Sequence, residues 1–269
     1  MTGLQALLLG LVQGFGEFLP ISSSGHLIVL PWLLGWPPQG LSFDVGLHLG
    51  TLFAVVGAFA GDWIRLLGAS FEGLRRREPF ATPDSRLIWL IVLASVPGGV
   101  AGVLLEDRAE TAFRSPALVA VAMAMLGGVL FLADRFGKGR SDIGALSARD
   151  AALIGLAQAA ALVPGVSRSG ATISMALFLG YRREEAARFS FLLATPITLG
   201  AAALKVPALL SGGAAPLALI GMAAAAGSGF LSIRWLLAYV RTRDYRPFVW
   251  YRLAFAAVVL GVYFVRAGC

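Results

Sequence analysis

The chain has 269 residues, of which 58% are hydrophobic and 14% are charged. Soluble domains carry about 25% charged residues, so this composition excludes an ordinary soluble protein and predicts an all-α polytopic membrane protein. The formal net charge of +7 does not indicate a nucleic-acid partner, because the basic residues lie in short segments between apolar runs. We expect one integral-membrane domain over residues 1–269.

The apolar runs, taken in chain order, define the expected architecture. Six of them are long enough, or nearly so, to cross a bilayer as a helix. They are Phe43–Ala60, Leu87–Leu105, Ala117–Ala133, Phe189–Leu204, Pro216–Tyr239 and Phe248–Val265. Two further apolar regions, about 3–35 and 151–180, are instead broken by Pro, Gly and Ser clusters.

The two broken regions resemble each other when they are aligned at an offset of 145 residues. The matched pairs include Ser22 with Ser167, Ser24 with Ser169 and Gly25 with Gly170. Chance is the alternative in a chain so rich in small residues, but only these two segments combine an apolar run with a Pro and Ser/Gly break. We therefore expect repeats over about 1–133 and 151–265, joined by a linker at 134–150.

Basic residues predict how the repeats are oriented. We expect 61–86 and 134–150 to be loops between spans. These loops and the segments 181–188 and 240–247 hold five, four, three and three Lys or Arg residues, so we assign them to the cytoplasm. Both ends of 151–180 then lie on one side, and this segment must enter the membrane and return. Region 3–35 must do the same from the other face. The sequence thus predicts about six transmembrane helices plus two re-entrant helical hairpins in an inverted-topology repeat, with tips that meet near the midplane.

The second break contains an arginine deep in apolar sequence. Pro164 and Gly165 stop a helix, and the Ser/Gly/Thr run after them can begin another, whose free N–H groups attract anions. Arg168 adds a planar guanidinium that suits phosphate or carboxylate oxygens. The alternative is a kinked helix with a snorkelling Arg, but roughly ten apolar residues on either side place the interface out of reach.

The first break combines a carboxylate, hydroxyls and an imidazole. Gln13 and Glu17 are four residues apart and share a helix face. The hydroxyls of Ser22 and Ser23 come within reach of His26 if a helix begins there, which would make a nucleophile, a base and an orienting group. The alternative is that the serines only cap the helix and that His26 is a hydrogen-bonded core residue.

Two further expectations concern charged groups near these breaks. An unpaired carboxylate is costly in a membrane, so we expect Glu17 to pair with Arg168. Asp44 and His48 lie one turn apart at the outer end of a predicted span and are weaker candidates, with a membrane-boundary role as the alternative.

Three motifs stand in the order and separation of a known family. They are Gln13-x-x-x-Glu17, Phe18-Leu19-Pro20-x-Ser22-Ser23-x-Gly25-His26 and Pro164-Gly165-x-Ser167-Arg168-Ser169-x-x-Thr172. With them the chain resembles, over essentially its whole length, the undecaprenyl-diphosphate phosphatase family, which is also known for bacitracin resistance. The resemblance implies hydrolysis of undecaprenyl diphosphate to undecaprenyl phosphate and inorganic phosphate, which recycles the lipid carrier of cell-wall synthesis. It also implies a multi-pass protein of the bacterial inner (plasma) membrane, with a polyprenyl diphosphate lipid as its partner.

Carried over residue by residue, the resemblance implies that Ser23 is the nucleophile, His26 an acid or base, and Glu17 an assisting base. Binding of the diphosphate is implied for Arg168 and for groups at the two breaks. These are Ser22, Gly165, Ser167, Ser169 and Thr172.

A divalent cation, Mg²⁺ or Ca²⁺, is a further expectation. It would bridge diphosphate oxygens and Glu17, with Gln13 as a second ligand. The family pattern accepts Glu or Gln at that position, and the Gln found here is the weaker ligand.

The sequence leaves two matters open. A transporter or flippase of polyprenyl phosphate would use the same inverted repeat and the same anion site, but would need no nucleophile. Whether the chain forms a homo-oligomer is not decided by its sequence.

Overall fold

The computed structural model describes residues 1–37, 41–110, 112–211 and 215–267, and Cys269 lies outside this part. Eleven α-helices and two 3-10 turns make up the described chain, with no strand among them. The α-helices are α1 (Gly3–Phe18), α2 (Ser23–Leu34), α3 (Leu41–Ala58), α4 (Ala60–Arg75), α5 (Pro83–Glu110), α6 (Pro116–Phe136), α7 (Ala148–Ala160), α8 (Arg168–Phe178), α9 (Arg183–Ser211), α10 (Ala215–Val240) and α11 (Arg246–Ala267). The 3-10 turns are η1 (Ala112–Arg114) and η2 (Ile143–Ala145).

The prediction of an all-α polytopic membrane protein is confirmed. Among the described residues, five helices are long and apolar enough to cross a membrane, namely α5, α6, α9, α10 and α11. A sixth span is present if the bent pair α3 and α4 counts as one. These are the six regions that the apolar runs predict.

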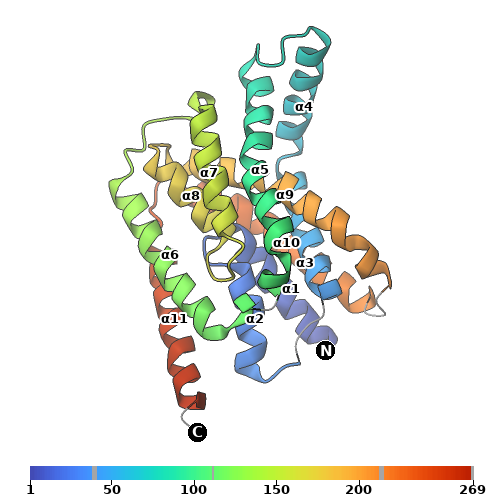
Figure 1. Cartoon of the computed structure of the whole chain (residues 1–269), viewed down its shortest axis with the longest axis vertical. Coiled ribbons are helices and arrows are strands. Elements are labelled where there is room, and N and C mark those ends of the chain that lie inside the picture. Colours follow the sequence, from blue (N-terminus) through green and yellow to red (C-terminus); the bar gives the residue numbers. More distant parts are fainter. Residues whose placement is uncertain (38–40, 111, 212–214, 268–269) are drawn as a thin grey trace.

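One predicted loop is wrong. The segment 61–86 was expected to connect two spans as a loop, but most of it forms α4 and the first turn of α5. Helix α4 begins after a bend of 75° from α3 and runs beside α5 (Figure 1). Its apolar side chains recur every three or four residues and are exposed, as Ile64, Leu67, Phe71 and Leu74. This spacing is that of an amphipathic helix. The segment was predicted to be a loop because it contains many charged residues.

Two pairs of helices are too short to cross a bilayer. Helices α1 and α2 have 16 and 12 residues, and α7 and α8 have 13 and 11. At 1.5 Å per residue each is shorter than the ~30 Å hydrocarbon core. Within each pair the two helices pack on each other, and α1 also contacts α8. The pairs therefore form two hairpins whose tips, residues 19–22 and 161–167, come together inside the helix bundle.

The two hairpins have the same local construction. Ser22 caps α2 and Ser167 caps α8, each by accepting a hydrogen bond from a glycine N–H three residues later. Both serines have a positive φ, 71° and 73°, which is uncommon for residues other than glycine. These matched caps support a duplication. The repeat boundaries, the linker and the re-entrant course in the membrane stay predictions.

Longer helices surround the hairpins. Helix α1 packs on α10, α10 on α3, α7 on α5, and α6 on α11. The largest buried apolar cluster includes Phe18 at the end of α1 and Phe191 on α9, whose rings meet edge-on with centroids 5.4 Å apart. Many outer side chains of the long helices are exposed and apolar, such as Phe264 and Leu104. Exposed apolar side chains over a whole circumference suit contact with lipid chains.

The orientation can be tested by cysteine labelling. In a Cys269→Ser background, we expect Arg76→Cys, which lies at the end of α4, to react with a membrane-impermeant maleimide only from the cytoplasm. Arg114→Cys, in η1, should react only from outside. Reaction of Arg76→Cys in intact spheroplasts would overturn the orientation derived from the basic residues.

Candidate active site at the hairpin tips

A buried ion pair joins the two tips. The guanidinium Nη2 of Arg168, the first residue of α8, lies 2.8 Å from Glu17 Oε1 near the end of α1. Their side chains are 14% and 9% exposed. The expected pairing of these two residues is therefore present. The other guanidinium nitrogen, Nη1, is buried and has no hydrogen-bond partner in the described chain. An unpaired charged donor of this kind is costly unless an anion occupies the site.

The same carboxylate also holds the predicted nucleophile. Ser23 Oγ donates to Glu17 Oε2 at 2.6 Å, and Gln13 Nε2 donates to the same oxygen at 3.1 Å. Ser23 and Arg168 are each the first residue of their helix, α2 and α8, so both side chains leave from a helix N-terminus. Such ends carry free N–H groups and a partial positive charge that favour a phosphate.

His26 lies at the same tip but is not bonded to Ser23. Its Nδ1 is 2.7 Å from the backbone oxygen of Ser22, and its Nε2 is 2.6 Å from the hydroxyl of Tyr251 on α11. The expected hydroxyl–imidazole pair is therefore replaced by a hydroxyl–carboxylate pair. The reason is the capped start of α2, which turns His26 back onto the Ser22 carbonyl.

The other predicted substrate-binding residues have structural partners. Ser22 and Ser167 cap their helices, and Ser169 Oγ donates to the Leu19 carbonyl of the opposite tip at 3.1 Å. Thr172 Oγ1 bonds the Arg168 carbonyl and lies 2.7 Å from Ser190 Oγ. The capping alternative therefore describes Ser22 but not Ser23, whose hydroxyl is bonded to Glu17. Substrate contact by these residues stays a prediction.

Gly165 is required by the backbone at the second tip. Its φ is +97°, and a Cβ there would lie 2.5 Å from the Val119 carbonyl oxygen of α6. Its own carbonyl accepts a hydrogen bond from Arg252 Nη2 at 2.7 Å. The predicted role of Gly165 in substrate binding is untested, but this geometry explains why no larger residue fits.

Sequence reasoning missed two residues of α11. Arg252 is fully buried and donates to carbonyls of both tips, and Tyr251 is bonded to His26. Both lie inside the run Phe248–Val265, which was read only as a span. An arginine within such a run is itself a functional signal, and it could have been used.

The two weaker candidates, Asp44 and His48, both lie on α3. Asp44 is paired with Arg114 at 3.0 Å, and its carbonyl is bonded to His48 Nδ1 at 2.8 Å. His48 is near enough to Glu17 for an electrostatic interaction. Asp44 is therefore part of an ion pair between α3 and η1, and a role of either residue in the site stays a prediction.

The fit of a divalent cation rests on two oxygens. Among the described residues, no group of three His, Cys, Asp or Glu side chains could hold a metal. However, Gln13 Oε1 is fully buried, has no hydrogen-bond partner, and belongs to the amide that contacts Glu17. A carboxylate and an orphaned amide oxygen fit a hard cation that takes its remaining ligands from diphosphate and water.

A groove lies along α2, the helix that begins at Ser23. It has a volume of about 350 Å³ and is lined by apolar and aromatic side chains, including Leu27, Pro31, Trp32 and Trp36, and by Arg114. Its lining suits an apolar chain attached to an anionic group.

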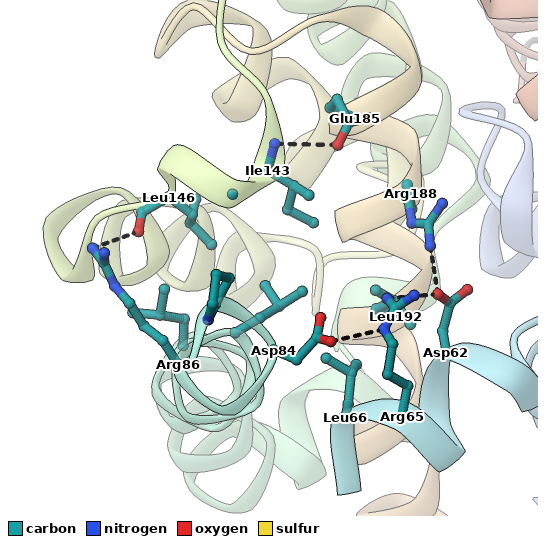
Figure 2. A pocket seen from close by; sticks show the side chains of 14 residues that line it. Asp62, Arg65, Leu66, Asp84, Arg86, Ile143, Leu146, Glu185, Arg188 and Leu192 are labelled. Carbon is teal, nitrogen blue, oxygen red and sulfur yellow. Dashed lines mark hydrogen bonds and ion pairs between the residues drawn. The ribbon is translucent and has the colours of Figure 1, made fainter. Parts of the chain in front are cut away.

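A second pocket, of about 190 Å³, lies away from the tips between α4, α5, α9 and η2. Figure 2 shows Arg65 and Arg188 converging on Asp62, at 3.0 and 2.5 Å, and Arg65 also reaching Asp84 at 2.9 Å. The carboxylates are used in ion pairs between helices. These ion pairs therefore connect α4 to α5 and to α9, and the arginines are already paired, unlike Nη1 of Arg168.

Comparison with known proteins decides the family. Residues 6–258 match the family model described as "Bacitracin resistance protein BacA". The chain belongs to this family. Three relatives named undecaprenyl-diphosphatase are similar over nearly all of both chains. That of Pelotomaculum thermopropionicum is 48% identical and covers 97% of this chain and 96% of its own. Those of Moorella thermoacetica and Geobacter sulfurreducens are 47% and 49% identical, each covering 99% of this chain and 100% of its own.

The ion pair gives a stability prediction. Glu17→Gln leaves the buried Arg168 without its carboxylate, so we expect the free energy of unfolding to fall by about 3 kcal/mol. Thermal unfolding in detergent would measure this, and added pyrophosphate should restore part of the loss by binding at Arg168.

Glu72→Gln is the matched control, because Glu72 pairs with Arg75 and Arg76 on the exposed surface of α4. An equal loss in both variants, or no effect of pyrophosphate on Glu17→Gln, would contradict the prediction.

Proposed function

We propose that this BacA-family chain is an integral-membrane phosphatase that hydrolyses undecaprenyl diphosphate to undecaprenyl phosphate and inorganic phosphate. One observation carries the proposal. A single carboxylate, Glu17, accepts the hydroxyl of Ser23 and is paired with Arg168, whose second guanidinium nitrogen is buried and free to bind an anion. Nucleophile, base and anion-binding group are therefore within one hydrogen-bonded set. The names of the full-length relatives support the same reaction.

The first step transfers the terminal phosphoryl group to the protein. Ser23 Oγ attacks the terminal phosphorus and gives its proton to Glu17 Oε2, which already accepts that hydroxyl. The new Oγ–P bond forms as the bond from phosphorus to the bridging oxygen breaks, and undecaprenyl phosphate leaves. Arg168 and the N-terminal amides of α2 and α8 stabilise the charge on the phosphoryl oxygens.

The second step releases inorganic phosphate. Once Glu17 is again a carboxylate, water attacks the phosphoserine and gives a proton to Glu17, which passes a proton to Ser23 Oγ as the Oγ–P bond breaks. His26 is the other titratable group at this tip, and we assign it the proton relay between the two steps: it accepts the Ser23 proton from Glu17 and passes it to the departing undecaprenyl phosphate. The geometry supports Glu17 as the base for Ser23 in place of His26, because only the carboxylate is bonded to the hydroxyl.

We also propose which membrane holds the protein and how the lipid binds to it. The multi-pass helices place the protein in a membrane, which we propose to be the bacterial inner (plasma) membrane, where the lipid carrier is used. The groove along α2 would hold the isoprenoid units next to the diphosphate, and the rest of the chain would lie in the bilayer. Because Arg114 lines this groove and is predicted to lie outside, we propose that the substrate enters from the outer leaflet.

Transport of polyprenyl phosphate is the alternative that the fold alone would allow. It needs an anion site but no activated hydroxyl. The 2.6 Å bond between Ser23 and Glu17 favours the phosphatase, because a carrier has no use for a nucleophile bonded to a base.

Phosphate release by the purified protein tests the function. We expect the wild type to release phosphate from undecaprenyl diphosphate, and Ser23→Ala to lower kcat by at least about 10³-fold while the lipid still binds. Arg168→Lys should lose most activity as well, because a point charge replaces a planar fork.

Ser70→Ala is the matched control, since this buried hydroxyl lies on α4 away from the tips. Full turnover by Ser23→Ala would exclude it as the nucleophile. Arg168-dependent binding of undecaprenyl phosphate without any hydrolysis by the wild type would favour a carrier.

We further propose that Glu17 and Gln13 hold a divalent cation, Mg²⁺ or Ca²⁺, together with the diphosphate. When bound, the cation would neutralise charge on the phosphoryl oxygens. The support is the orphaned oxygen of Gln13, which belongs to the amide whose nitrogen contacts Glu17.

Exchange of the amide for a carboxylate tests the cation. Gln13→Glu should raise the affinity for Mn²⁺, used as a spectroscopic probe of the site, by about tenfold, and Gln13→Leu should lower it, because carboxylate is the stronger ligand. Electron paramagnetic resonance titration in the presence of inorganic pyrophosphate would measure binding without reference to turnover. Equal affinities in all three proteins would remove Gln13 from the cation site.

A further inference from the structure

Helix α11 contacts both hairpin tips through two adjacent residues, neither of which belongs to the hairpins. We propose that α11 is the third element of the active site. The hydroxyl of Tyr251 holds the His26 ring in one orientation through its hydrogen bond with Nε2, and the guanidinium of Arg252 holds the two tips at the separation at which Glu17 reaches both Ser23 and Arg168. Both are positioning residues, and the proposal rests on the phosphatase function proposed above.

Arg252 binds the backbone at the points where the helices are broken. Its Nη1 donates to the carbonyl of Pro20 at 3.1 Å, and its Nη2 donates to those of Gly165 and Val166 at 2.7 and 3.3 Å. Its Nε donates to the Met123 carbonyl of α6 at 2.9 Å. These carbonyls lie at depth in the bundle, and those of the breaks have no helical partner. One side chain therefore satisfies acceptors from the first tip, the second tip and α6 together.

Only arginine has the shape for these contacts. The guanidinium directs several N–H groups outward in one plane, whereas the ammonium of lysine is a compact point charge. Arg252 is 0% exposed, so water cannot take the place of a missing donor. Loss of the fork would leave carbonyls of both breaks unsatisfied and let the tips move apart. The Glu17–Arg168 bond joins the two tips, and the Glu17–Ser23 bond spans the first tip. Both bonds would lengthen if the tips moved apart.

Tyr251 fixes the orientation of the His26 ring. The partner of Nδ1 is the Ser22 carbonyl, which can only accept, so Nδ1 carries a hydrogen. In the neutral ring Nε2 is then the acceptor, and Tyr251 donates to it at 2.6 Å. The Tyr251 ring also lies nearly parallel to the imidazole, at 13° and 5.6 Å, and Phe255 of α11 packs against the imidazole at 4.4 Å. The Ser22 carbonyl therefore sets the protonated nitrogen of His26, and helix α11 holds the ring in place and supplies the donor to Nε2.

These contacts predict an effect on turnover more than on binding. The lipid is held by the groove along α2 and by the bilayer, which α11 variants leave in place. Misplacement of reacting groups by a fraction of an ångström to 1 Å lowers the rate of the chemical step by up to about 10²-fold.

The hydroxyl of Tyr251 is tested by Tyr251→Phe, which keeps the ring contacts. We expect kcat for undecaprenyl diphosphate to fall by about tenfold, with KM within about threefold and thermal unfolding unchanged. The control is Tyr239→Phe, because Tyr239 stacks on Trp235 of α10, away from the tips. An unchanged kcat in Tyr251→Phe would overturn the proposal.

The Nε2 nitrogen of His26 gives a readout that does not depend on activity. The chain has only two histidines, so ¹⁵N-histidine NMR of the protein in detergent shows two rings, and His48→Asn assigns them. We expect His26 to be protonated at Nδ1 in both proteins, because the Ser22 carbonyl is unchanged. The ¹⁵N signal of Nε2 should move in Tyr251→Phe toward that of an unprotonated nitrogen without a hydrogen bond. If the wild type does not hydrolyse the lipid, the proposed function fails, and the NMR result alone decides whether Tyr251 positions His26. An unchanged Nε2 signal in Tyr251→Phe would overturn that role.

The fork of Arg252 is tested by Arg252→Lys. We expect kcat to fall by about 10²-fold in protein that still unfolds cooperatively, whereas Arg234→Lys, on the exposed side of α10, leaves kcat unchanged. Wild-type turnover by folded Arg252→Lys would overturn the role of Arg252. If this variant yields no folded protein, Tyr251→Phe decides whether α11 belongs to the site.

Discussion

Charged side chains inside a membrane protein are paired with one another or with backbone carbonyls, and in this chain one ion pair joins two segments that are far apart in sequence. Glu17 and Arg168 are separated by 151 residues, yet their side chains meet at 2.8 Å. Each comes from a hairpin tip, so the pair forms only when both tips turn back inside the bundle. The carboxylate that satisfies Arg168 also accepts the hydroxyl of Ser23. One electrostatic requirement therefore links the fold to the chemistry.

The two tips share a backbone design but differ in their side chains. At the offset of 145 residues, Ser23 corresponds to Arg168, and each begins its helix after a serine cap with positive φ. The carboxylate and the imidazole have apolar counterparts, because Leu162 and Ala171 stand where Glu17 and His26 would be. One hairpin thus supplies the hydroxyl and its base, and the other supplies the cation that binds an anion. The pair makes one asymmetric site.

The long helices do more than enclose this site. Helix α6 packs against the second tip so closely that Gly165 has no room for a side chain. Helix α11 adds a tyrosine and an arginine that contact His26 and the broken backbone. A helix break in a membrane exposes carbonyls that need donors, and a buried guanidinium meets several of them at once. Helices α6 and α11 therefore keep the non-helical backbone of the two tips in a fixed position.

The sequence by itself determined the class, the six spanning regions and the two breaks, because apolar length and Pro/Gly/Ser interruptions are local properties. It also identified Glu17, Ser23, His26 and Arg168, since polar groups are rare and costly in such runs. It misread 61–86 as a loop, because charges hid the apolar stripe of α4.

Only the tertiary structure decided which groups bond to each other. Local spacing placed His26 beside the Ser22 and Ser23 hydroxyls, but the strained cap at Ser22 and the hydroxyl of Tyr251 hold the ring elsewhere, and Glu17 takes the hydrogen bond from Ser23. The part played by Arg252 depends on carbonyls from three separate segments. Contacts of this kind are set by the packing of distant helices, which no local pattern records.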